Sequence, residues 1–80
     1  MTGIGGFAIL KKIHIEGSYI TLGQLLKMLD MIDSGGQAKH FLMDVEVKVN
    51  GEVETRRGRK LYPQDIVAVD GFGSVQVVQD

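Results

Sequence analysis

Two stretches of this 80-residue sequence carry groups that suit the binding of phosphate. The first begins at Ser34 and reads Ser-Gly-Gly-Gln-Ala-Lys. Ser34 suits the N-cap of a helix, and Gln37 can close a capping box by reaching back to the Ser34 amide. Glycine costs a helix about 1 kcal/mol relative to alanine, so Gly35 and Gly36 indicate that bare backbone has a use there. Amides at a helix N-terminus bind phosphate, and Lys39 on the next turn adds a full positive charge.

A packing role for these two glycines is the alternative, and the stretch alone favours neither interpretation. Gly35 and Gly36 would then allow the second helix to lie close against the preceding one. The two interpretations differ in geometry. Anion binding requires both amides to be exposed on the same face as Arg57 and Arg59, whereas the packing role buries them against the first helix.

The second stretch is a basic loop that places four of the nine Lys and Arg residues within five positions. Its cations are Arg56, Arg57, Arg59 and Lys60. Guanidinium forks match phosphate oxygens, and Gly58 lets the backbone bend close to a ligand. The alternative is a solvated hairpin whose charge is balanced by nearby carboxylates, namely Glu46, Glu52 and Glu54.

Composition limits the class of protein. Eighty residues make one domain, and the net charge of −1 is less informative than the clustering of the cations. The absence of cysteine suits a reducing cytosol. No apolar run approaches the ~20 residues that span a bilayer, and no signal peptide is recognisable, so we expect a cytoplasmic protein with no membrane segment. We expect residues 1–10 to be a flexible segment and residues 11–80 to form the domain.

The apolar pattern predicts a first strand at residues 13–15, which two helices follow along the chain. Thr21 and Gln24 form a capping box that begins a helix over residues 22–32. Its apolar residues recur at helical spacing and are Leu22, Leu25, Leu26, Leu29 and Ile32. The second helix begins after Ser34 and carries Ala38, Phe41 and Leu42 on one face.

The rest of the chain predicts strands. Residues 45–49 alternate between valine and charge, residues 66–69 are apolar, and residues 75–78 contain three valines. Asn50-Gly51 indicates a hairpin turn. A two-residue loop would pair Val49 with Glu52, whereas a three-residue loop pairs Val49 with Val53, and we predict the latter. Because helices and strands do not alternate, the fold class is α+β, with two short helices packed on a small, mostly antiparallel sheet.

Signals for catalysis are weak. His14 and His40 have no partner at metal-ligand spacing, and no serine lies in a nucleophile motif. We therefore expect no enzyme activity, no metal, no cofactor and no small-molecule substrate. The five aromatic residues form no obvious stacking platform, which favours structured or duplex RNA read through its shape and phosphates. The aromatics are Phe7, Tyr19, Phe41, Tyr62 and Phe72.

Several of these motifs, in this order and spacing, resemble the S-four RNA-binding domain, or αL motif. The similarity is strongest to its small stand-alone bacterial branch, the YbcJ/YaaA type, and covers roughly residues 19–78. It rests on residues 34–39, 47–51, 54–61 and 65–67. The resemblance implies two helices on a small sheet and RNA binding through the start of the second helix and the basic loop. The RNA-binding residues predicted are Ser34, Gly35, Gly36, Gln37, Lys39, Arg56, Arg57, Arg59 and Lys60.

Two positions depart from the family pattern. Many S-four domains carry arginine where this chain has Gly35, which leaves more of the phosphate contact to the backbone. Many also carry glycine where this chain has Val45. Valine tolerates a left-handed helix cap badly, so we expect a different junction between helix and strand here.

The expected function is a monomeric, non-catalytic module that binds structured RNA. Because the resembled branch is linked to ribosome maturation, the implied partner is ribosomal RNA or a ribosomal particle. The alternative is a protein–protein interaction module that docks through the second helix and the basic loop.

Overall fold

The computed structural model describes residues 9–80. Residues 1–10 are the segment expected to be flexible. Of these, residues 1–8 lie outside the described residues, and Ile9 and Leu10 belong to the first strand. The elements, in chain order, are β1 (Ile9–Ile15), β2 (Ile20–Thr21), α1 (Leu22–Met28), α2 (Gly35–Asp44), β3 (Val47–Val49), β4 (Glu52–Val53), β5 (Lys60–Leu61), β6 (Ile66–Val69) and β7 (Gly73–Gln79). No helix within residues 9–80 is long and apolar enough to cross a membrane.

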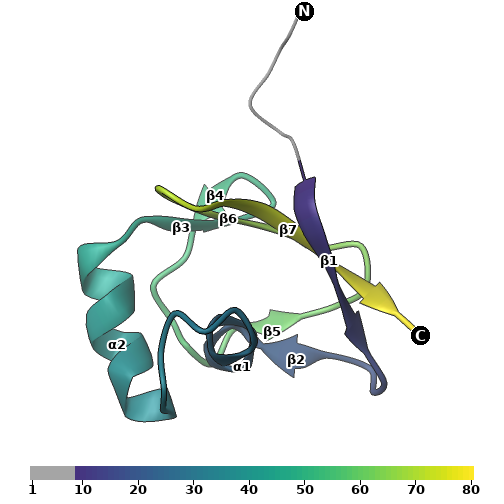
Figure 1. Cartoon of the computed structure of the whole chain (residues 1–80), viewed down its shortest axis with the longest axis horizontal. Helices are drawn as coiled ribbons and strands as arrows, with labels where there is room; N and C mark the ends of the chain where they lie inside the picture. The colour runs from purple at the N-terminus through teal and green to yellow at the C-terminus, as the bar shows by residue number, and fades with distance from the viewer. Residues whose placement is uncertain (1–8) are drawn as a thin grey trace, which may run out of the picture.

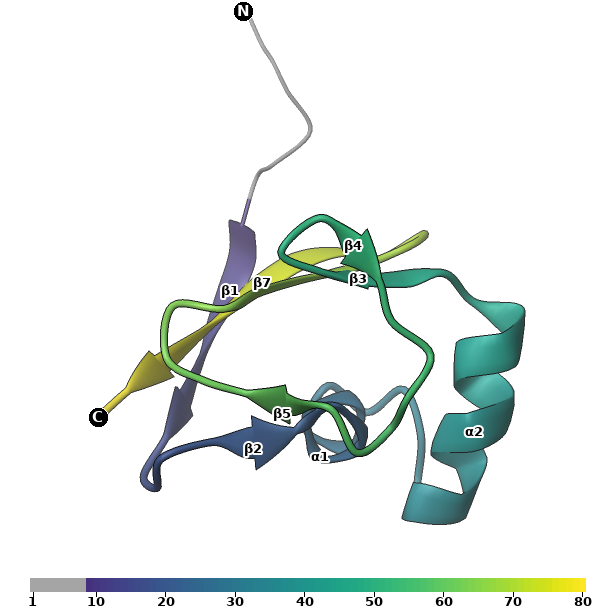
Figure 2. The same ribbon diagram turned by 180° about the vertical axis from the view of Figure 1, so that it is seen from behind.

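The strands form a five-stranded sheet of order β1-β7-β6-β3-β4 and a separate two-stranded ladder of β2 and β5. Only the pairing of β1 with β7 is parallel among these described strands. The large sheet forms one layer, α1 and the small ladder lie opposite it, and α2 stands at one side (Figures 1 and 2). The predicted fold class, α+β with two helices on a mostly antiparallel sheet, is confirmed.

The core lies between these layers. Helix α1 contributes Leu22, Leu25 and Leu26, which are fully buried. Strand β3 turns Val47 and Val49 inward, and its Lys48 points to the other face because side chains alternate along a strand. From α2 and β5, Ala38, Leu42 and Leu61 complete the side of the core below the sheet. The predicted apolar faces of both helices are therefore confirmed.

Helix α1 ends four residues earlier than the 22–32 range predicted. Asp30 adopts a left-handed conformation with φ 60°. Its amide donates to the carbonyl of Lys27 at 3.0 Å, and the Met31 amide donates to that of Leu26 at 3.1 Å. This pair of bonds is a Schellman motif, which stops the helix even though the apolar spacing continues. Ile32 still reaches the core, but from the turn that follows.

The register predicted for the β3–β4 hairpin is wrong. Val49 pairs with Glu52 and Lys48 with Val53, so the loop has two residues. Both loop residues, Asn50 and Gly51, have positive φ, at 52° and 88°. This conformation matches the right-handed twist of paired strands, and the turn geometry outweighs the better side-chain pairing of the alternative register.

The junction after α2 needs no left-handed residue. Val45 caps the helix in an extended conformation, with φ −122° and ψ 129°. Its amide donates to the Phe41 carbonyl at 2.8 Å before the chain continues into β3. An extended conformation suits a β-branched residue, so the helix ends at Val45 without the left-handed cap that valine tolerates badly.

The glycine that permits close packing is Gly23, in the first turn of α1. A Cβ at this position would lie 3.4 Å from the Arg57 carbonyl oxygen and 3.8 Å from the Cβ of Ala38. At Gly35, by contrast, a Cβ would meet nothing within 4 Å. The basic loop and α2 thus both approach α1 at Gly23.

Gly23→Val should lower the free energy of unfolding by about 2 kcal/mol, because the added methyl groups overpack this junction. Gly35→Val is the matched control. Its side chain enters open space, so we expect a change of about 0.5 kcal/mol or less. Urea denaturation measures both values, and equal changes at the two positions would show that Gly23 is not a packing site.

Candidate nucleic-acid interface

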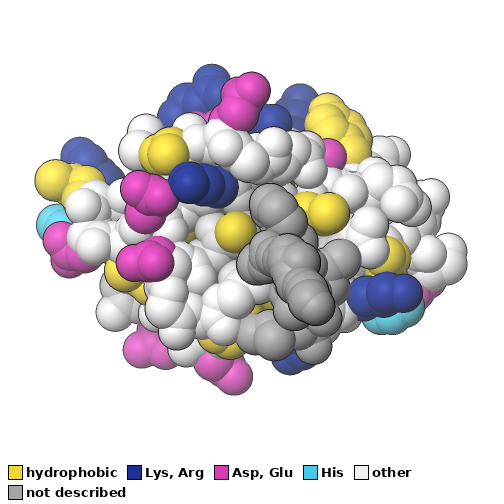
Figure 3. All heavy atoms as spheres, turned by 90° about the horizontal axis from the view of Figure 1, so that it is seen from above, with side chains coloured by type: hydrophobic (Ala, Val, Ile, Leu, Met, Phe, Trp, Pro, Cys, Tyr) yellow, Lys and Arg dark blue, Asp and Glu magenta, His cyan; other side chains and the backbone are white. Residues whose placement is uncertain are grey.

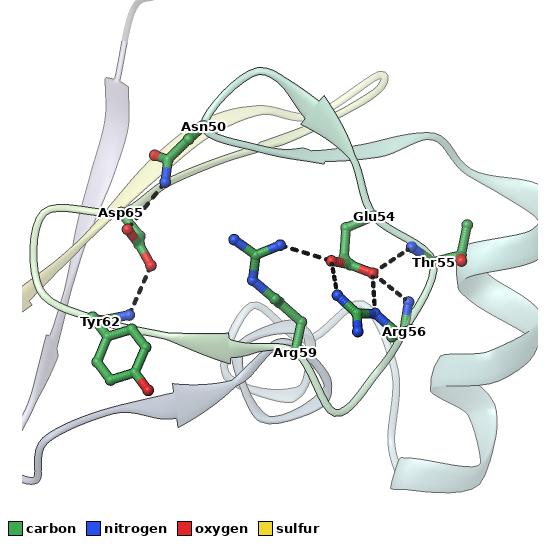
Figure 4. Close-up of polar contacts among 7 residues, drawn as sticks. All are labelled: Asn50, Glu54, Thr55, Arg56, Arg59, Tyr62 and Asp65. Atoms are coloured by element: carbon green, nitrogen blue, oxygen red, sulfur yellow. Dashed lines mark hydrogen bonds and ion pairs between the residues drawn. The ribbon is translucent and has the colours of Figure 1, made fainter.

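The basic loop is built around a buried carboxylate, that of Glu54. This residue follows β4, and its amide donates to the Val47 carbonyl at 2.8 Å. Only 7% of its side-chain surface is exposed. The carboxylate accepts hydrogen bonds from the amides of Thr55 and Arg56 at 3.1 and 3.0 Å (Figure 4). A buried charge requires such partners, and here the loop itself wraps round to supply them.

Two arginines complete the shell around Glu54. Arg56 donates from Nε and Nη2 at 3.0 and 3.2 Å, and Arg59 reaches across the loop to donate from Nη1 at 2.8 Å. The side-chain bond from Arg56, then its amide and the bond from Arg59, outweigh desolvation and lower the pKa of Glu54 to about 2. The same carboxylate raises the pKa of Arg56.

The loop also closes the N-terminus of α1. The amides of Leu22 and Gly23 donate to the carbonyls of Arg59 and Arg57 at 2.9 and 2.8 Å. The capping box predicted at Thr21 is present as well, with Gln24 accepting from the Thr21 amide at 2.8 Å. The first amides of α1 are thus used within the protein, and this helix start offers no free donors to an anion.

The start of α2 has the opposite character. Gln37 Oε1 accepts from the Ser34 amide at 3.2 Å and also from the Asp33 amide, so the predicted capping box is present. Gly35 and Gly36 are exposed, and neither packs against α1. The packing interpretation of these two glycines is therefore wrong. The first turn of a helix leaves its amides without intrahelical acceptors, and here that turn faces solvent.

A single hydrogen bond joins the two predicted stretches. Arg57 Nη1 donates to the carbonyl of Gly35 at 2.8 Å. The guanidinium therefore lies at the exposed start of α2, although the two residues are far apart in the sequence. Lys39 and Lys60 are also exposed. Arg59 differs from Arg57, because it is directed at Glu54 and only 34% of its side chain is exposed.

The predicted site residues thus fall into three groups. Ser34 and Gln37 set the start of α2, where Gly35 and Gly36 present their amides. Within residues 9–80, the site cations that form no ion pair with Glu54 are Lys39, Arg57 and Lys60. Arg56 and Arg59 bind Glu54, although 74% of the Arg56 side chain remains exposed.

The sequence did not reveal the polar contacts that connect the turns before and after the basic loop. The Asn50 side chain donates to Asp65 at 3.0 Å, and Asp65 accepts from the Tyr62 amide at 2.8 Å (Figure 4). Asn50 also accepts from the Ile66 amide at 2.9 Å. The turn at Asn50 is therefore tied to the turn after β5. A polar residue in each of two turns was the only available signal, and it does not reveal that the turns meet.

The opposite side of the molecule has a different charge pattern. Figure 3 looks onto the outer face of the five-stranded sheet, where acidic and basic side chains are interspersed. Lys48 belongs to this face, and its Nζ lies 3.5 Å from Glu46 Oε2. At the junction of the basic loop with α2, Lys39, Arg57 and Lys60 form no such ion pair within residues 9–80. This junction is therefore a better surface for an anionic polymer.

Comparison with known proteins agrees with this architecture. The S4 domain family matches residues 13–78, so the chain belongs to that family. A Bacillus subtilis (strain 168) relative named "Probable ribosome maturation protein RlbA" is 59% identical over 66 residues, which cover 82% of this chain and 93% of the relative. An Escherichia coli (strain K12) relative named "Putative RNA-binding protein YbcJ" is 40% identical over 72 residues, or 90% of this chain and 94% of the relative. The resemblance to the small stand-alone branch is confirmed.

Glu54 should make the free energy of unfolding depend on pH in the acidic range. Its folded pKa of about 2 lies below the model-compound value of 4.5, so the unfolded chain takes up a proton first as the pH falls. The stabilisation by Glu54 is complete above pH ~5 and is lost between about pH 5 and 2. After allowance for solvent screening, this stabilisation is on the order of 2 kcal/mol.

Glu54→Gln should be less stable at pH 7 and should lose this acid dependence. The exposed Glu52→Gln is the matched control and should keep it. Urea denaturation at several pH values measures the effect. Identical pH profiles for the two variants would contradict the role given to Glu54.

Proposed function

We propose that this protein is a monomeric, non-catalytic RNA-binding module of the cytoplasm that recognises structured RNA, and ribosomal RNA in particular, during ribosome maturation. The observation that carries the proposal is the 2.8 Å hydrogen bond from Arg57 to Gly35. It unites a basic loop and an open helix start into one surface. Membership of the S4 domain family and the names of the two relatives support an RNA partner.

Phosphates are the groups that this surface suits. The amides of Gly35 and Gly36 and the side chains of Arg57, Lys39 and Lys60 are all donors, and phosphate oxygens are acceptors. Contacts of this kind position a nucleic acid without reading its bases. They suit an RNA recognised through its folded shape.

Arg56 and Arg59 have a supporting role in this proposal. Their charges first compensate Glu54, so four cations and one carboxylate leave the loop with a net positive charge. Arg56 remains exposed enough to contact a phosphate while it holds the carboxylate. Glu54 itself is unsuited to general acid–base catalysis, because its low pKa keeps it ionised at neutral pH and both of its oxygens are already engaged.

Removal of two cations that do not bind Glu54 should weaken RNA binding and reduce its salt dependence. We expect Arg57→Ala with Lys60→Ala to reduce the slope of log K against log salt by about 2, one for each lost phosphate contact. Lys48→Ala, on the outer sheet face, is the matched control and should leave the slope unchanged. Fluorescence anisotropy with a labelled RNA hairpin measures this, and an unaltered slope in the double variant would rule out the basic loop as the contact.

The two glycines of α2 allow stability to be separated from binding. Gly35→Ala with Gly36→Ala should raise the free energy of unfolding by up to about 1 kcal/mol, because alanine favours a helix and both positions have space. The same variant should bind RNA more weakly, since two methyl groups stand where a phosphate would approach the backbone. Unchanged affinity in the stabilised variant would remove the start of α2 from the interface.

The protein–protein interaction module remains the competing proposal, and co-purification from cells distinguishes the two. Ribosomal particles or RNA that are lost after RNase treatment support RNA binding. Partner proteins that survive RNase, and that are lost in the Arg57 and Lys60 double variant, support the competing role.

A further inference from the structure

The small β2–β5 ladder has an outward face made of aromatic and basic residues. Ile20 pairs with Leu61 and Thr21 with Lys60, so the antiparallel register places Tyr19 across from Tyr62 at the next position. Side chains alternate along each strand, and Leu61 is fully buried. The other face of the ladder, which carries Tyr19 and Tyr62, therefore points away from the core.

The two tyrosines form an exposed pair. Their ring centroids lie 5.9 Å apart, and the ring planes are inclined by 52°. Tyr19 is 43% exposed and Tyr62 is 48% exposed, so each ring keeps much of its surface in solvent. The inclination prevents the rings from stacking on one another, which leaves aromatic faces available to a third planar group.

Positive charge adjoins this pair. The Lys60 ammonium lies 4.9 Å from the centroid of the Tyr19 ring. A hollow of about 480 Å³ runs from Tyr62 along the basic loop. The residues that line it are Arg56, Gly58, Arg59, Lys60 and Tyr62. One surface thus joins aromatic faces to phosphate-binding donors, although the sequence separates Tyr19 widely from the other groups.

We propose that Tyr19 and Tyr62 stack an unpaired nucleobase of the bound RNA, while Lys60 contacts the phosphate of the same nucleotide. This inference rests on the proposed RNA-binding function and extends it from the recognition of phosphates to the recognition of an unstacked base. Bases that are splayed out of bulges and loops stack on aromatic side chains in this way. The face is too small for a run of bases, so the ligand class is a structured RNA with one exposed nucleotide beside a helix.

The wild-type protein provides the first test. Three RNAs that differ only at one position are compared: a duplex with one bulged adenosine, the same duplex with an abasic ribose at the bulge, and the same duplex without the bulge, which is fully paired. All three offer phosphates, but only the first offers a free base. We expect the bulged adenosine to bind about fivefold or more tightly than the abasic RNA, which is the lower range for stacking of one base.

Matched variants locate the effect. Tyr62→Phe keeps an aromatic face and should preserve the preference, whereas Tyr62→Leu should bring the affinity for the bulged RNA down to that for the abasic RNA. Its affinity for the abasic and fully paired RNAs should not change. A 2-aminopurine base at the bulge supplies a direct readout, because stacking quenches its fluorescence with the wild type and Tyr62→Phe but not with Tyr62→Leu.

The outcomes separate this inference from the function on which it rests. Equal binding of the bulged and abasic RNAs by the wild type overturns the stacking site and leaves RNA binding in place. The same holds if Tyr62→Leu weakens all three RNAs equally. Failure to bind any of the three RNAs, at low salt, overturns both proposals.

Discussion

The buried carboxylate of Glu54 is the constraint on which the candidate interface depends. A charge in this position must be surrounded by donors, and the next five residues supply them by turning back over it. That turn directs two backbone carbonyls at the start of α1 and places the Arg57 guanidinium at the start of α2. One acidic residue therefore organises a basic loop. Its negative charge is the reason that several cations can be held close together in a defined geometry.

Both helices begin with the same capping chemistry, but their first amides have different surroundings. Each begins with a capping box, at Thr21 and Ser34. The amides of α1 are covered by the loop carbonyls, which fixes the loop against the core. Those of α2 face solvent, and its glycines add no side chain that would hinder a ligand. The difference lies in what packs in front of each helix, with Gly23 providing the space at α1. A structural contact at one helix thereby positions the candidate binding surface at the other.

Much of the fold was predictable because its signals are local. Apolar spacing identified both helices and the faces that they bury, and valine alternation identified β3. The predictions failed where a local pattern met a competing backbone conformation. Asp30 ended α1 by adopting a left-handed conformation, and Asn50 and Gly51 set the hairpin register through their positive φ values. In both places the turn geometry outweighed the side-chain pattern. The short β2–β5 ladder escaped prediction because two residues in each strand carry too little periodicity to identify.

The sequence alone determined which residues could hold phosphate, since donor type, glycine content and capping spacing are properties of neighbouring residues. It also carried the resemblance to the S4 domain family, which the comparison with known proteins confirmed. The tertiary structure decided how those residues are used. Arg56 and Arg59 turned out to be bound to Glu54, Arg57 to lie at Gly35, and Tyr19 to lie beside Tyr62. Each of these contacts depends on strand pairing or packing between distant segments. Such contacts leave no regular spacing in the sequence, so only the folded chain brings the candidate phosphate-binding groups and the aromatic groups onto one surface.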